Sequence, residues 1–86
     1  MKYIINLTGT KDVSSFHETV KNLDGQIELV SDNGRYKVNA KSYLGCLMAS
    51  SEWSKIWVQT APDLDYYTEL EPWIETAADD GAYIHN

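Results

Sequence analysis

The sequence predicts one α+β domain of the order β-α-β-β-α-β-α, with three helices on one face of a four-stranded antiparallel sheet. In four segments apolar residues recur at every second position, and in three others they recur three and four apart. Each predicted strand then has one apolar face and each helix one apolar stripe, and stacking all helices on one face of the sheet buries both. A chain of 86 residues with 43% hydrophobic positions is enough for one such core.

The first strand and helix follow directly from these patterns. Residues 2–7 alternate, and residues 11–23 carry a helical stripe that stops before Gly25, a residue typical of helix ends. Two further alternating runs, 26–31 and 35–40, flank Asn33-Gly34. We expect a tight hairpin there, because both turn residues tolerate positive φ.

The second half begins where the period changes from two to that of a helix. Ser42 is the predicted N-cap of a short helix over about Tyr43–Ala49. A fourth strand follows over 55–60, and then a third apolar stripe from Leu64 to Ala77. Pro72 interrupts that stripe, so we expect a bend or an early end near 69–72.

The polar face of the sheet is predicted to meet solvent, and the end of the chain to be loose. The domain is expected to span residues 1–78, with a loose tail over 79–86. The residues expected on the solvent face of the sheet are Ile4, Asn6, Glu28, Val30, Lys37, Asn39, Trp57 and Gln59.

Composition restricts the functional classes. A single cysteine excludes an intramolecular disulfide, and one thiol with two histidines is too few for a usual zinc cage. The net charge of −6 opposes binding to nucleic acid, and the N-terminal residues turn polar too soon for a signal or a membrane span. We therefore expect a cytoplasmic protein with no metal, no cofactor and no membrane or nucleic-acid partner.

The stretch Val38-Asn39-Ala40-Lys41-Ser42-Tyr43-Leu44-Gly45 resembles the HPr family, the histidine-containing phosphocarrier of the bacterial sugar phosphotransferase system. It looks like the strand end, lysine, regulatory serine and following helix of that family. The segment from Tyr67 to Ile74 is similar to its last helix. The resemblance implies the HPr-like open-faced β-sandwich and covers about residues 2–76.

The phosphoryl-accepting histidine of the family is missing. Counting back from the helix, Gly9 stands at its position, with Lys11 at the position of the family's arginine and Asp12 at that of its proline. No lysine-aspartate pair replaces a nucleophilic imidazole. His17 lies inside the predicted helix and is the remaining candidate nucleophile, although we interpret it as a partly exposed helical residue.

The resemblance also marks a regulatory and a docking region. Ser42 matches the serine that a dedicated kinase phosphorylates, and its alternative interpretation is a helix N-cap, which we favour while both could hold. Lys11 and Lys41 are candidate contacts for an anion or a partner.

The family's apolar docking patch maps onto the second predicted helix. Tyr43, Leu47 and Met48 form the candidate partner surface. Burial against the sheet is the alternative for Leu44 and Leu47, and it is the one we expect, whereas Tyr43 and Met48 should be exposed. Cys46 is expected to be a buried hydrophobe.

Three hypotheses follow. The first is a protein that is not an enzyme but a regulatory or interaction domain, with phosphotransferase-system components or an HPr-type kinase as partners. The second is a divergent phosphocarrier that uses His17 or another nucleophile. The third is an HPr-like fold reused for an unrelated binding role. The sequence does not indicate an oligomeric state.

Overall fold

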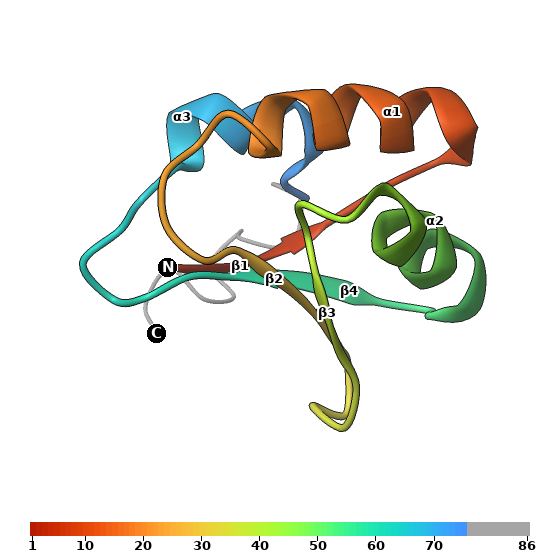
Figure 1. The fold of residues 1–86 in the computed structure, drawn as a ribbon. Helices are drawn as coiled ribbons and strands as arrows, with labels where there is room; N and C mark the ends of the chain where they lie inside the picture. Colours follow the sequence, from red (N-terminus) through yellow and green to blue (C-terminus); the bar gives the residue numbers. More distant parts are fainter. Residues whose placement is uncertain (76–86) are drawn as a thin grey trace.

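The computed structural model describes residues 1–75. The predicted tail over 79–86 and the end of the third stripe at Ala77 lie outside them. Within these residues the chain is an α+β fold whose helices all lie on one side of a four-stranded sheet (Figure 1). The elements are β1 Lys2–Ile5, α1 Gly9–Val20, β2 Glu28–Ser31, β3 Lys37–Asn39, α2 Tyr43–Glu52, β4 Ile56–Gln59, α3 Tyr67–Leu70 and the 3-10 turn η1 Glu71–Trp73.

The sheet has the strand order β1-β4-β2-β3, and every neighbouring pair is antiparallel. The predicted class, antiparallel sheet and set of three helices are confirmed. A buried cluster fills the space between sheet and helices. It contains Ile5, Leu7, Val13, Phe16, Val20, Ile27, Leu29, Ala40, Cys46, Ala49, Ile56, Val58, Leu70 and Ile74.

The solvent face of the sheet differs from the prediction at Val30. Its side chain is only 3% exposed. Its direct cross-strand neighbours are Trp57 on β4 and Lys37 on β3, and these two long side chains flank a short valine. Lys2 adds to the same face, with its Nζ atom 5.2 Å from the centre of the Trp57 ring. The prediction that Val30 meets solvent is therefore wrong.

The hairpin between β2 and β3 forms, but with a different turn. Only Gly34 has positive φ, at 75°, and Asn33 does not. The Gly34 N–H donates to the Ser31 carbonyl at 2.9 Å, which closes the turn over the two residues between them. The side-chain oxygen of Asn33 accepts from the Ser31 hydroxyl at 2.7 Å and from the Arg35 N–H at 2.9 Å. Asn33 thus stabilises the loop through its side chain.

The helix boundaries also differ from the predicted ones. α1 begins at Gly9 and ends at Val20, earlier at both ends than predicted, and α2 continues to Glu52 instead of ending at Ala49. Ser50 and Ser51 are tolerated in the last helical turn, where the Ser51 hydroxyl donates to the Met48 carbonyl at 3.2 Å.

α3 is much shorter than its apolar stripe. It starts only at Tyr67, whose N–H donates to the Asp65 carboxylate at 3.0 Å. Pro72 then ends it in the turn η1, as predicted. Trp73 packs edge-on against Phe16 of α1 with ring centres 5.5 Å apart. The turn η1 therefore packs against the core beside α1.

Candidate functional site

Ser42 lies at the turn from β3 into α2. It has extended backbone angles, and its hydroxyl oxygen accepts from the Gly45 N–H at 3.1 Å. The predicted N-cap is confirmed, and the residue is exposed. The Ser42 hydroxyl is therefore exposed to solvent while it caps the helix.

Asn39 fixes the geometry of this turn, a role that the sequence analysis did not assign to it. Its side-chain oxygen accepts from the Lys41 N–H at 2.8 Å, and its carbonyl accepts from the Ser42 N–H at 2.9 Å. Asparagine is common in such turns, because its side-chain oxygen can accept from the backbone N–H two residues further along the chain. Asn39 therefore holds Ser42 where the helix begins.

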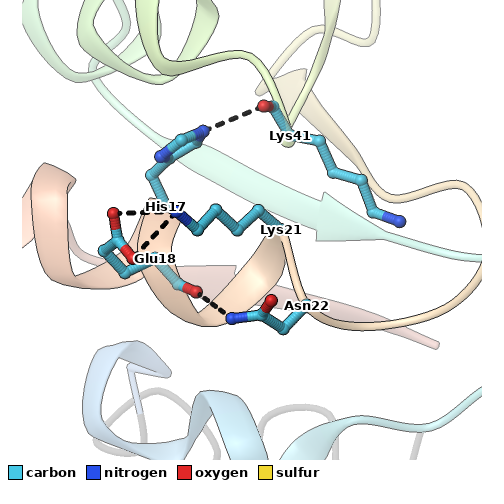
Figure 2. Close-up of polar contacts among 5 residues, drawn as sticks. All are labelled: His17, Glu18, Lys21, Asn22 and Lys41. Carbon is cyan, nitrogen blue, oxygen red and sulfur yellow. Dashed lines mark hydrogen bonds and ion pairs between the residues drawn. The ribbon is translucent and has the colours of Figure 1, made fainter.

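His17 contacts this turn from α1 (Figure 2). Its Nε2 atom lies 2.9 Å from the Lys41 carbonyl oxygen, and its ring packs edge-on against Tyr43 at 5.5 Å. A carbonyl only accepts, so Nε2 carries the proton of this bond. His17 is half-buried, as predicted, and it ties α1 to the start of α2.

Tyr43 makes a second link between the two helices. Its hydroxyl lies 3.4 Å from the Ser14 hydroxyl, and Ser14 precedes His17 by one turn on the same side of α1. The sequence pattern could not reveal these contacts, because they join residues far apart in the chain. The predicted exposure of Tyr43 is confirmed at 37%.

The Asp12 carboxylate, in the first turn of α1, caps the start of this helix. The Thr8 N–H donates to Oδ2 of Asp12 at 2.9 Å, so an acid already neutralises the helix start. Gly9 has φ of 76° and presents no side chain there. A second anion at this position would meet the negative charge of Asp12.

The two candidate lysines are not brought into one cluster by a direct contact. Lys11 is exposed in the first turn of α1. Lys41 is half-buried, and its side chain extends away from the His17 ring (Figure 2). Within residues 1–75 an ion pair joins Lys21 to Glu18 at 3.0 Å, and neither Lys11 nor Lys41 forms one. The ammonium groups of both candidate lysines can therefore contact an anion or a partner.

An apolar surface surrounds the start of α2. Leu44 is 75% exposed and Met48 is 38% exposed. The buried residues of α2 are Cys46 and Ala49, which place Leu44 on the opposite side of the helix. The expected burial of Leu44 is therefore wrong. Leu47 is half-buried against the core, which leaves it a minor part of this surface.

Cys46 is buried as predicted, and its thiol donates to the Ala40 carbonyl at 3.1 Å. Burial raises the pKa of the Cys46 thiol to about 11. A thiol in this state is a poor nucleophile at neutral pH. Among residues 1–75 no three His, Cys, Asp or Glu side chains gather into a metal site.

The fold and this site define a small α+β domain with an exposed, serine-capped helix bordered by apolar side chains. No helix among the described residues is both long and apolar enough to span a membrane. Comparison of the chain with protein-family models, curated proteins and solved structures finds no match.

Proposed function

We propose that this chain is a cytoplasmic, HPr-like interaction domain that carries no phosphohistidine and docks a protein partner at the start of α2. The observation that carries this proposal is the contrast between the two helix starts. The start of α2 presents an exposed serine beside exposed apolar side chains, whereas the start of α1, with Gly9 and Asp12, provides no imidazole to form a phosphohistidine.

The element order and the antiparallel sheet support an HPr-like architecture. The order β-α-β-β-α-β-α and three helices on one face are those that the resemblance implies. The close packing of α2 on β3 is also consistent with the glycine in the motif. A Cβ atom at Gly45 would lie 3.2 Å from both the Asn39 carbonyl oxygen and the Val38 Cβ atom. A glycine therefore suits this position sterically.

Ser42 is the regulatory position in this proposal. A phosphate there would add about two negative charges at the N-terminus of α2, where the helix dipole favours an anion. The new charge would border the exposed side chains of Tyr43 and Leu44. Phosphorylation would thus change the character of the docking surface from apolar to anionic.

Phosphorylation by an HPr-type kinase tests this role. With kinase and ATP, the intact protein should gain the mass of one phosphate, and Ser42→Ala should gain none. Ser51→Ala is the matched control, because Ser51 is an exposed serine at the other end of α2. An unchanged mass of the wild type, or a phosphate retained by Ser42→Ala, would contradict the proposal.

A second assay separates this proposal from a divergent phosphocarrier. The protein is incubated with phosphoenolpyruvate and the general phosphotransferase enzyme, alongside an authentic HPr protein as positive control. We expect no acid-labile phosphate on this chain, because the Lys41 carbonyl engages His17 and Asp12 occupies the start of α1. An acid-labile phosphate on this chain would refute the non-carrier proposal, and its loss in His17→Gln would assign it to His17.

A further inference from the structure

We propose that the groove between β3 and α2 binds an extended segment of a partner protein that carries a basic side chain beside a large apolar one. The groove has a volume of about 510 Å³. Its lining residues are Tyr36, Lys37, Val38, Met48, Glu52 and Trp53. Met48 also borders the docking surface at the start of α2, but this second site does not depend on the phosphotransferase likeness.

β3 offers backbone hydrogen bonds along this groove. It is an edge strand, and its bonds to β2 use alternate residues: Tyr36 accepts from Ser31, and Ala40 donates to Ile27. In an antiparallel pair this alternation directs the N–H and C=O groups of Lys37 and Asn39 away from β2.

Three of these four groups are unpaired within residues 1–75. The Asn39 carbonyl already accepts from the Ser42 N–H, which leaves the Asn39 N–H and both groups of Lys37. These groups can pair with an extended peptide that adds a strand to the sheet. The backbone of β3 thus specifies the conformation of the occupant.

The side chains specify an apolar residue. Val38 pairs with the fully buried Leu29, so it lies on the helix side of β3, and Tyr36 shares that side. Every second side chain of an added strand would point to the same side, toward Met48 and Trp53. A large apolar residue fits there.

The hairpin end of the groove favours a cation. An adjoining hollow shares Tyr36, Glu52 and Trp53 with the groove and adds Asp32. A basic side chain entering it would meet the Glu52 carboxylate and two aromatic rings, together with Asp32, whose Oδ1 atom also accepts from the Trp57 Nε1–H at 3.4 Å. Within residues 1–75 neither carboxylate is paired with a lysine or arginine.

Lys37 does not fill this position itself. It pairs with Val30 on the opposite face of the sheet, so its side chain starts out on the face away from the helices. The net charge of −6 further favours approach of a basic segment.

A library of random dodecapeptides displayed on phage provides the test. Enriched peptides should combine arginine or lysine with a large apolar residue two positions away, on the same face of the added strand. For one such peptide, fluorescence anisotropy should show at least a tenfold weaker affinity for Glu52→Lys. The amide signals of Lys37 and Asn39 should shift in NMR spectra of the wild type on peptide addition.

Glu69→Lys is the matched control, because Glu69 is an exposed acid on α3 and should bind the peptide as the wild type does. Glu52→Lys should fold, since a cation suits the C-terminal turn of a helix. The proposal is overturned by the absence of enriched peptides, by enriched peptides without a basic residue, or by equal binding to Glu52→Lys. If an enriched peptide binds Leu44→Asp more weakly than the wild type but binds Glu52→Lys equally well, its site lies at the start of α2, and the proposal is also overturned.

Discussion

Replacing Ser42 tests whether the start of α2 depends on one side-chain oxygen. Ser42→Ala removes the acceptor that lies 3.1 Å from the Gly45 N–H. Loss of such an N-cap costs about 1 kcal/mol of the free energy of unfolding. For a domain of this size that loss lowers Tm by roughly 4–8 °C. Because the site is exposed, water can satisfy the Gly45 N–H, so the cost should not greatly exceed this value.

Ser42→Asp separates the cap from the effect of charge. Aspartate keeps the acceptor and adds a negative charge at the helix N-terminus, which contributes about 0.3–1 kcal/mol. We expect its Tm to equal or exceed that of the wild type, and this variant also introduces about half the negative charge of a phosphate. Thermal unfolding followed by circular dichroism, with Ser51→Ala as control, measures both effects. If Ser42→Ala melts with the wild type, or if Ser42→Asp melts below Ser42→Ala, the assigned cap is incorrect.

Three further predictions concern buried or constrained positions. Because burial raises the pKa of Cys46 from 9.0 to about 11, the fold favours the neutral thiol. The stability that the neutral Cys46 thiol contributes is complete below about pH 9 and is lost as the pH rises toward about 11. In urea titrations the free energy of unfolding of Cys46→Ala should therefore fall less over that pH range than that of the wild type. The native thiol should also react with iodoacetamide at pH 8 far more slowly than the unfolded one, and equal rates would contradict its burial. Gly25→Ala should destabilise more than Gly9→Ala in urea unfolding. Both glycines have positive φ. At Gly25 a Cβ atom would lie 2.6 Å from Cδ1 of Leu64, so that side chain must shift, whereas nothing lies within 4 Å at Gly9. Equal losses would show that Leu64 shifts without cost. His17→Ala should cost about 1–2 kcal/mol, because it removes a hydrogen bond and an aromatic contact, and an unchanged urea midpoint would argue against this link between the helices.

The sequence predicts the class of the fold because periodicity is a local property. Each strand and helix turns one apolar face toward the core, and the residues that form its apolar and polar faces lie close together in the sequence. The same holds for the cap at Ser42, which is visible as a polar residue at a change of period. The hairpin position is likewise marked by Asn33 and Gly34.

What the sequence did not predict depends on contacts between distant segments. Leu44 looks like a core residue by type, but only the packing of Cys46 and Ala49 on the sheet shows that it lies on the outer side of α2. The bond between His17 and Lys41 joins residues 24 positions apart. Exposure of one leucine and anchoring of one histidine therefore required the tertiary structure.

The short bridge beside β1 has a consequence for self-association. Ile74 pairs with Ile5, the Asn6 N–H donates to the Trp73 carbonyl, and the Glu75 N–H donates to the Ile4 carbonyl. The chain itself thereby pairs the outer edge of β1 at Ile4 and Asn6, while β3 at the other end of the sheet is open within residues 1–75. Two copies joined through β3 would each present this partly covered edge to the next copy. Such pairing can produce a dimer, and the contacts of Trp73 and Glu75 with β1 oppose further edge-to-edge growth.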